Sequence, residues 1–315
     1  MKIKTNSSAI VGGTTTLKKM FIFCSILLLA FVQTSTGFIL EPYTDHDNCN
    51  RKHVTVAELR DIFLGRCVDF QTNLHSERLC TDGLKNCTDL WLKFSMAFRD
   101  RPPCNVTADL YTDFIKTANH AIAGKQLFYS GAYELAQQYS SIGNRYTTVE
   151  KTLIGYLIDR LGFCGGTAGN SPSVSCESWD PVTCPYTASG SFWQIVSENF
   201  AGNAAGDVYA LLNATRNPIF KSNSYFAKFE LPNLRSGMVT NLTAILINDS
   251  PTTKRDPCNT DDSLKSLKNI VKAKNIEFVC RENPGDLVYL FCVDNASTDL
   301  CKNVTIYQSG NIVIP

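Results

Sequence analysis

The chain has little of what would tie it to nucleic acid, to a phosphate-binding loop or to a histidine-based active site. Its 30 Lys and Arg residues balance 29 Asp and Glu residues, so no electrostatic footprint for nucleic acid or an anionic membrane is visible. No G-x-S-x-G motif occurs, and no Lys-Ser/Thr follows the glycines of residues 165–169. The histidines have no spacing typical of a metal site or a triad: His46, His53, His75 and His120. We therefore expect no metal and no nucleic-acid partner.

Long apolar runs are also scarce. The strongest one, residues 20–32, follows Lys18 and Lys19 and gives way to polar residues that end at Gly37, which is a signal-peptide pattern. A membrane span needs roughly 20 apolar residues, so cleavage near Gly37 is favoured over a retained type II anchor. Residues 311–315 carry no hydrophobic tail of the kind that a lipid anchor requires. We predict a secreted protein with no membrane span after cleavage.

Cysteine, by contrast, is abundant. One of the 13 cysteines, Cys24, lies in the predicted signal, and the even number that remains predicts complete pairing in an oxidising compartment, in about six disulfides. No C-x-x-C motif or Cys/His pair indicates zinc instead. N-x-S/T sequons agree with passage through a glycosylating pathway, although Cys87 weakens the first: Asn86, Asn105, Asn213, Asn241, Asn248, Asn295 and Asn303.

The two halves of the chain show different periodicities. Up to about Ala205 the apolar residues recur at helical spacing, as in Leu59, Ile62 and Phe63. After that point, short apolar runs predict strands at residues 208–212, 242–247, 276–279 and 287–293. An amphipathic helix is predicted at residues 264–271. Strand, helix and strand in succession indicate a small parallel sheet, with a ligand cleft between it and the helical half.

Three stretches stand out from this pattern, and each has a structural interpretation. In TTVEKTLIGYLID, residues 147–159, Glu150 could close a capping box with Thr147. In SGSFWQIVSENFA, residues 189–201, Trp193, Val196 and Phe200 could belong to a helix core, although Ser197 and Trp193 could equally line a pocket. In the third stretch, YFAKFELPNL, residues 225–234, Glu230 reads as a solvated position of a strand-like run.

Together with the cysteine spacing, these stretches resemble the ADP-ribosyl cyclase family, whose vertebrate members include the surface antigen CD38. The resemblance covers residues 67–301. It implies an α+β fold: an N-terminal helical part, a C-terminal α/β part with a small, mainly parallel four-stranded sheet, and a cleft between them. The implied division is a signal peptide at residues 1–37, a helical domain at 38–122 and 148–204, and an α/β domain at 123–147 and 205–315.

The resemblance also implies roles for individual residues. Glu230 matches the family's catalytic glutamate, Trp193 a tryptophan of the nicotinamide pocket, and Glu150 the acidic residue of the T-L-E-D-T-L signature. Tyr129 stands where the family commonly has a second pocket tryptophan. The other implied substrate-binding positions are Ser130, Asp159, Ser197, Tyr225 and Phe226. The implied disulfides are Cys67–Cys87, Cys104–Cys184, Cys164–Cys176, Cys258–Cys280 and Cys292–Cys301, which leaves Cys49 and Cys80 as a sixth pair.

The chain departs from the family pattern at several positions. Tyr129 keeps an aromatic face but adds a hydroxyl, and Lys151 reverses the charge beside Glu150. Both half-cystines of one family disulfide are missing together, at Ala123 and Ala205. Asp159 follows Glu150 by nine residues, which on a straight helix would place the two on opposite faces unless the helix bends near residue 155.

The activity implied by the resemblance is cleavage of the nicotinamide–ribose bond of NAD, with ADP-ribose, cyclic ADP-ribose or both as products. NAD is then the substrate, no cofactor is expected, and a homodimer is possible. One alternative is a secreted nucleotide-binding protein of the same fold with impaired catalysis, which Tyr129 and Lys151 make conceivable. A disulfide-rich hydrolase of another kind would need a nucleophile motif that the sequence lacks.

Overall fold

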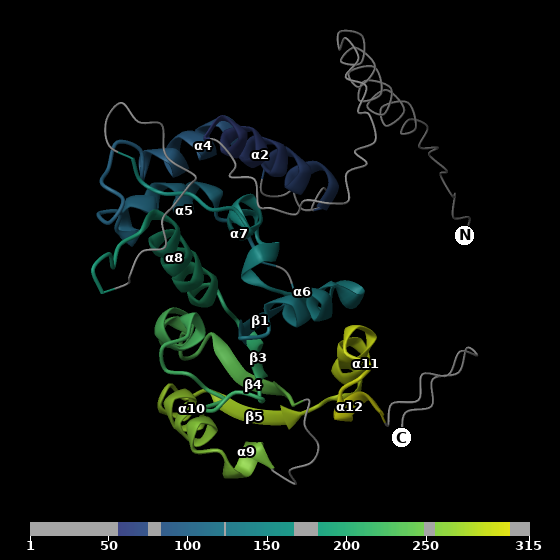
Figure 1. Ribbon diagram of the computed structural model, residues 1–315. Helices are drawn as coiled ribbons and strands as arrows, with labels where there is room; N and C mark the ends of the chain where they lie inside the picture. The colour runs from purple at the N-terminus through teal and green to yellow at the C-terminus, as the bar shows by residue number, and fades with distance from the viewer. Residues whose placement is uncertain (1–55, 75–82, 123, 167–181, 249–255, 303–315) are drawn as a thin grey trace, which may run out of the picture. The chain divides into compact units, whose positions relative to one another are not determined.

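The computed structural model describes residues 56–74, 83–122, 124–166, 182–248 and 256–302, all within one compact unit, residues 53–315 (Figure 1). The predicted signal peptide and the cysteines Cys49, Cys80 and Cys176 lie outside these ranges, as does Ala123. No helix within them is long and apolar enough to cross a membrane. The division into a helical and an α/β domain stays a prediction.

The described residues contain a parallel sheet of five strands, one more than predicted, in the order β2-β1-β3-β4-β5. The strands are β1 Lys125–Ser130, β2 Tyr146–Thr147, β3 Gly206–Asn213, β4 Val239–Ile247 and β5 Glu277–Glu282. Every pair is parallel, as predicted, and the predicted strands at residues 208–212, 242–247 and 276–279 are confirmed. The sequence did not predict β1 and β2, which lie in the half that reads as helical.

Helices cover both faces of this sheet, because its central strands β3 and β4 end in nearly continuous buried runs whose side chains point to either face in turn. On one face, Leu212 and Leu246 share a core with Leu267 of α10 (Asp262–Ala273), the helix predicted at residues 264–271. On the other face, Leu211 and Ile245 pack with α6 (Tyr133–Ser141) and α11 (Gly285–Asp294). In Figure 1, α10 lies on one side of the strands and α6 and α11 lie together on the other.

A second group of helices lies beyond the sheet and is built around aromatic side chains. Its members are α2 Val56–Asp69, α4 Cys87–Met96, α5 Thr112–Ala118, α7 Leu153–Ile158 and α8 Ala188–Gly202. The Phe94 ring lies within 5.5 Å of those of Phe63 and Phe192. The same core continues to the sheet, where Phe200 of α8 contacts Phe128 of β1 at 5.3 Å between ring centroids. Buried apolar area therefore holds α8 against the sheet.

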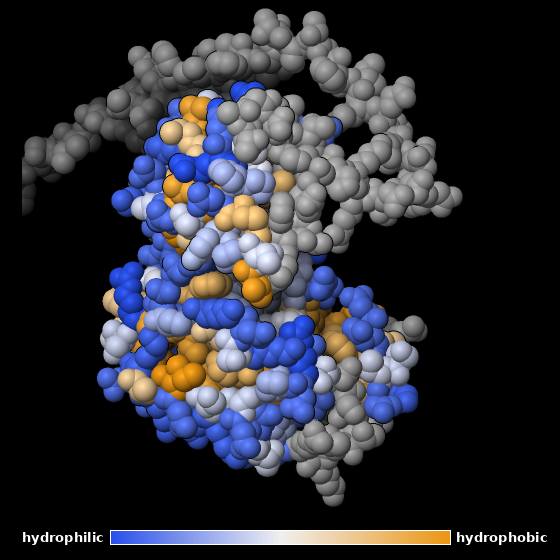
Figure 2. All heavy atoms as spheres, turned by 60° about the vertical axis from the view of Figure 1, so that its left-hand side comes forward, coloured by the Kyte–Doolittle hydropathy of each residue, from blue (hydrophilic) through white to orange (hydrophobic). Residues whose placement is uncertain are grey.

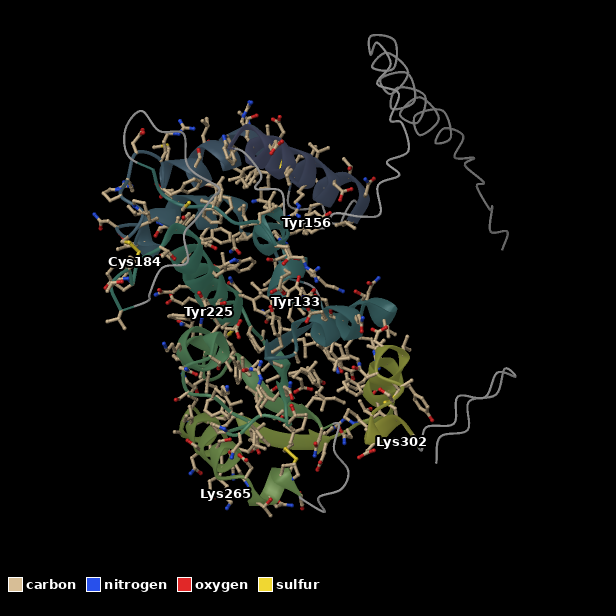
Figure 3. All side chains as sticks on the ribbon, in the orientation of Figure 1. Tyr133, Tyr156, Cys184, Tyr225, Lys265 and Lys302 are labelled. Carbon is tan, nitrogen blue, oxygen red and sulfur yellow. A yellow bond between two sulfur atoms is a disulfide. The ribbon has the colours of Figure 1, made fainter. Side chains whose placement is uncertain are left out.

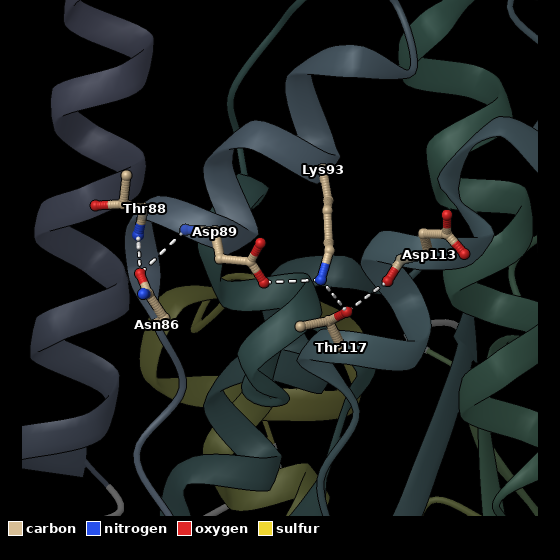
Figure 4. Close-up of polar contacts among 6 residues, drawn as sticks. All are labelled: Asn86, Thr88, Asp89, Lys93, Asp113 and Thr117. Atoms are coloured by element: carbon tan, nitrogen blue, oxygen red, sulfur yellow. Dashed lines mark hydrogen bonds and ion pairs between the residues drawn. The ribbon is translucent and has the colours of Figure 1, made fainter.

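Polar contacts fix the start of α4 and join this helix to α5 (Figure 4). The side chain of Asn86 accepts hydrogen bonds from the backbone amides of Thr88 and Asp89, which are two of the unpaired donors at the helix start. One turn later, Lys93 donates to Asp89 at 2.7 Å and to Thr117 of α5 at 3.0 Å. These contacts set the start of α4 and join it to α5.

Four of the implied disulfides are confirmed: Cys67–Cys87, Cys104–Cys184, Cys258–Cys280 and Cys292–Cys301. Cys164 is also disulfide-bonded, while its expected partner Cys176 lies outside the described residues. The pairs join α2 to α4 and α9 (Pro257–Thr260) to β5, and Cys292–Cys301 joins α11 to α12 (Asp299–Lys302). Each crosslink restricts the unfolded chain and so favours the folded one.

The predicted strand at residues 287–293 is wrong, because these residues belong to α11. A short apolar run does not by itself distinguish a strand from a buried helix. Here Leu287 packs against the sheet and Cys292 forms its disulfide with α12, whereas Val293 is exposed. On the face shown in Figure 2, hydrophilic residues surround separate groups of apolar ones.

Candidate active site

The order of the strands indicates where a ligand would bind. From β1 the chain passes to β2 on one side, and it later enters β3 on the other side of β1. In open α/β sheets, ligands bind beyond the carboxyl ends of the strands at such a reversal. Tyr129 and Ser130 end β1, and Glu150 follows β2 by three residues. The topology therefore brings these predicted site residues to one edge of the sheet.

Glu150 is buried, and hydrogen bonds hold both of its carboxylate oxygens. The Tyr129 hydroxyl donates to Oε1, and Gln137 Nε2 of α6 donates to Oε2 at 2.7 Å. Thr148 donates to Gln137 Oε1 at 3.2 Å, which fixes the orientation of that amide. Burial raises the pKa of Glu150, and the hydrogen bond from Tyr129 acts in the opposite direction. Gln137 has no signal in the sequence, because it lies in an ordinary amphipathic helix.

The capping box proposed for Glu150 is not formed. Thr147 belongs to β2, and Glu150 lies in a single 3-10 turn, η4 (Val149–Lys151). The chain leaves the helical conformation at Thr152, whose hydroxyl donates to the carbonyl of Val149 and caps α7 by accepting from the Gly155 amide. The helix is therefore interrupted at Thr152, three residues before the predicted bend. Glu150 and Asp159 do not lie on one straight helix, so the argument that they must face opposite sides no longer applies.

Asp159 directly follows α7 and is linked to the Glu150 network by Tyr133 and Tyr129. Its carboxylate oxygens each lie 2.9 Å from the Tyr133 hydroxyl, which donates to them and accepts from Arg160 Nε at 3.1 Å. The Tyr133 ring meets that of Tyr129 edge-on, with 5.9 Å between the centroids. Tyr133 comes from α6 and lies between the aromatic helices and the sheet in Figure 3. Sequence reasoning missed Tyr133 as a member of this network.

Glu230 is almost fully buried, with 6% of its surface exposed, so the reading as a solvated strand position is wrong. It ends a π-helical turn, η5 (Phe226–Glu230), which turns the carboxyl group inward. Burial is the main cause that raises the pKa of Glu230 to about 8, and the charge of Glu150 adds to it. A hydrogen bond from Ser197 opposes both. Glu230, Glu150 and Ser197 therefore lie close enough to influence one another.

Helix α8 carries the predicted Trp193 and Ser197, and it packs against η5. Thr187 caps this helix by accepting from the Gly190 amide at 3.1 Å. Val196 is buried in the core, which confirms the core role proposed for it. Ser197 is also buried, one helical turn after Trp193. Trp193 itself is half-buried, packed against the core edge-on to Phe192 at 5.4 Å between centroids. Part of the Trp193 side chain therefore stays exposed, and a flat aromatic ring could stack on it.

The residue that precedes η5 and the residue that begins it lie in different surroundings. Tyr225 is 45% exposed, contacts the Phe229 ring and donates to the carbonyl of Gly190 at 3.4 Å. Phe226 is fully buried between Phe128 and Phe220, so any contact of this residue with substrate would involve its backbone. Figure 3 shows Tyr225 at about the level of Tyr133.

Other features lie outside this constellation. Lys151, the residue that reverses the family's charge, donates to Ser141 at the end of α6 at 2.9 Å. A cavity of about 500 Å³ lies between α8 and residues 232–235, and Glu198 and Arg235 line it. Within the described part of the chain, no group of three or more His, Cys, Asp or Glu residues could hold a metal ion.

Known proteins resemble this chain over most of its length. The model of the family described as ADP-ribosyl cyclase matches residues 56–301. An "ADP-ribosyl cyclase/cyclic ADP-ribose hydrolase" of Aplysia californica is 34% identical over 254 residues, which are 79% of this chain and 88% of that protein. The rabbit (Oryctolagus cuniculus) "ADP-ribosyl cyclase/cyclic ADP-ribose hydrolase 1" is 34% identical over 242 residues, 76% and 80% of the two chains.

Solved structures agree. A crystal structure of Aplysia cyclase, complexed with substrate NGD and product cGDPR, superimposes with a TM-score of 0.69 at 33% identity, over 78% of this chain and 96% of that one. Porcine CD38 with a covalent intermediate gives a TM-score of 0.66 at 30% identity, over 73% and 97%. The family match, the parallel sheet and four confirmed disulfides lead to one conclusion: this chain belongs to the ADP-ribosyl cyclase family.

Proposed function

We propose that this protein cleaves the bond between nicotinamide and ribose in NAD and releases nicotinamide with ADP-ribose, cyclic ADP-ribose or both. The observation that carries the proposal is the Glu230 carboxyl group, buried and bonded to Ser197, with Glu150 near enough to raise its pKa. Relatives named cyclase and hydrolase, and a related structure with a substrate and its cyclic product, support the same activity. The signal-peptide pattern and the disulfides support action outside the cell.

A single carboxylate is sufficient for this reaction. When the bond from ribose C1′ to the pyridinium nitrogen breaks, its electron pair leaves with nicotinamide, which departs neutral and needs no proton. The acid of ordinary glycoside hydrolysis is therefore unnecessary. The ribose is left with cationic character, which an ionised Glu230 in a poorly solvated site would stabilise by charge, by bonding the ribose hydroxyls or by transient attachment.

The neighbouring residues would orient the nicotinamide. The exposed part of Trp193 would stack on the pyridinium, where its main use is positioning, because the cation–π attraction fades as the ring becomes neutral. The Glu150 carboxylate accepts from Tyr129 and Gln137, and Thr148 and the Glu150 backbone amide also lie within hydrogen-bonding reach of it. A carboxylate offers about four lone-pair sites, so the carboxamide of the substrate would replace one of these donors.

The proposed activity is tested by incubating the secreted protein with NAD and measuring nicotinamide release across pH 5 to 10. Only ionised Glu230 can stabilise the ribosyl cation, so kcat/KM should rise with pH through about 8, the raised pKa of this carboxyl group. The positive pyridinium of bound NAD should lower that pKa, so kcat should rise at a lower pH than kcat/KM. Absence of nicotinamide release at every pH would refute the proposal.

The ratio of the two products should depend on Tyr225. The reacting ribose can meet water, which gives ADP-ribose, or adenine N1 of the same molecule, which gives the cyclic product. Tyr225 is 45% exposed and bulky, so we expect it to exclude water and favour cyclisation. Tyr225→Gly should shift products towards ADP-ribose by several-fold, with Tyr225→Phe as the control that keeps the bulk. An unchanged product ratio in Tyr225→Gly would remove this role.

A further inference from the structure

The side chain of Arg216 lies at the reversal point of the sheet. Arg216 follows the carboxyl end of β3, and Gly131 follows the carboxyl end of the neighbouring β1. Its guanidinium is packed so closely on Gly131 that a Cβ atom on that glycine would lie 1.9 Å from Arg216 Cζ. The group therefore fills the space that a side chain at position 131 would occupy. Asn213 closes the contact by donating to the carbonyl of Gly131 at 3.2 Å.

The Arg216 guanidinium is packed against Gly131, but no described residue neutralises its charge. Among the described residues, no carboxylate or carbonyl group accepts a hydrogen bond or ion pair from the Arg216 side chain, although the residue is half-buried. An arginine offers five N–H donors in a rigid fork that matches phosphate oxygens. By contrast, Arg66 donates to three backbone carbonyls at the end of α7, including that of Asp159 at 2.7 Å. Arg66 is thus a structural arginine, and Arg216 keeps its donors for another partner.

The position of Arg216 limits what that partner is. Tyr129 and Ser130 end the same strand that Gly131 follows, and Tyr129 bonds to Glu150. A dinucleotide whose nicotinamide lies by Glu150 would extend along this edge, where the crevice of a reversed parallel sheet accepts ligands. The anionic part of that molecule is its diphosphate, and bidentate pairing with arginine suits such a group.

We propose that Arg216 is a specificity-determining residue that binds the diphosphate of the substrate, so that the enzyme selects dinucleotides over phosphate-free nicotinamide ribosides. This inference rests on the proposed function, because NAD is the substrate that supplies both groups. Gly131 is part of the proposed diphosphate site, since any side chain at this position would displace the Arg216 guanidinium. The glycine leaves room for an arginine that comes from the adjacent strand.

The test compares two substrates that share the scissile bond, NAD and nicotinamide riboside. Arg216→Gln should lower kcat/KM for NAD by about 10- to 100-fold, mostly through KM, and change that for nicotinamide riboside by less than about twofold. Arg216→Lys, which keeps the charge but loses the fork, should be intermediate on NAD. The matched control is Arg235→Gln, because Arg235 also lies beside a glycine, Gly202, but borders the separate cavity. It should behave as the wild type on both substrates.

An equal loss on both substrates would overturn the proposal, since it would show a general structural role, and so would an unchanged KM for NAD. Titration calorimetry with ADP-ribose separates this inference from the proposed function, because it needs no turnover. If the wild type cleaves neither substrate, the proposed function fails. Weaker binding of ADP-ribose by Arg216→Gln than by the wild type and Arg235→Gln would still support the diphosphate site. Equal binding by all three, or none by the wild type, would overturn it.

Discussion

Replacement of Glu230 by Gln is expected to reduce kcat for NAD by about 10³-fold or more, the scale seen when a central electrostatic group is removed. The amide keeps the size of the side chain and can still bond to Ser197, but it carries no charge to stabilise the ribosyl cation. KM should change little, because the loss falls on the transition state. The measurement is initial-rate kinetics with an NAD analogue that becomes fluorescent on cleavage.

The control for this variant is Glu198→Gln, since Glu198 lies on α8 next to Ser197 but borders the separate cavity and accepts from Gln194. Its kcat should equal that of the wild type. Retained turnover in Glu230→Gln would contradict the assignment of the catalytic carboxylate. Turnover absent in the wild type as well would favour the alternative of a nucleotide-binding protein with impaired catalysis.

The same variant should show that the charge on Glu230 opposes folding. The folded protein binds this proton more tightly than the unfolded chain, since the pKa is raised from 4.5 to about 8. The free energy of unfolding therefore falls as the pH rises from about 4.5 through about 8. Glutamine does not ionise, so Glu230→Gln lacks this fall in the free energy of unfolding. The difference in melting temperature between the variant and the wild type should therefore increase in favour of the variant as the pH rises across this range.

Replacement of Gly155 by Ala is expected to lower the free energy of unfolding by about 3 kcal/mol, at the upper end of overpacking effects. An added Cβ would lie 2.0 Å from the carbonyl oxygen of Val149 and 2.8 Å from Glu150 Cα. Both are backbone atoms, so the η4 turn must move and carry Glu150 with it. The melting temperature should fall by about 6–12 °C for a domain of this size, and nicotinamide release should fall in the fraction that stays folded.

The matched control is Gly65→Ala in α2, where an added Cβ meets nothing within 4 Å. This change should stabilise the protein by about 0.5–1 kcal/mol, because alanine favours a helix over glycine. Differential scanning calorimetry of both variants gives the comparison. Equal melting temperatures for Gly155→Ala and the wild type would mean that the turn does not pack on α7 as closely as the structure has it.

The elements that could be predicted are those whose pattern is strong and local. The strands β3, β4 and β5 and the helix α10 follow from apolar runs and from an amphipathic period. β1 was missed because it lies in the half of the chain with helical periodicity, far along the chain from its pairing partner β3. β2 was missed because it has only 2 residues. Residues 287–293 carry an apolar run that either a strand or a buried helix would satisfy.

For the site, the resemblance of three motifs selected Glu230, Glu150, Trp193 and Ser197, but residue patterns alone favoured capping, core or solvated roles. Burial of Glu230 could not be read from its neighbours, because a π-helical turn replaces the expected alternation of a strand. Gln137 and Tyr133 were missed for a similar reason. Their contacts to Glu150 and Asp159 depend on where α6 packs.

The sequence by itself determined the central strands through its apolar runs, and its motifs determined the family by resemblance. That resemblance also implied the four disulfide pairs that the structure confirms. Only the tertiary structure decided the state of the carboxyl groups. The pKa of Glu230 is raised because folding removes it from water and brings Glu150, 80 positions earlier, close to it. Desolvation and long-range charge depend on the distances between atoms in space, and no local pattern of residues encodes them.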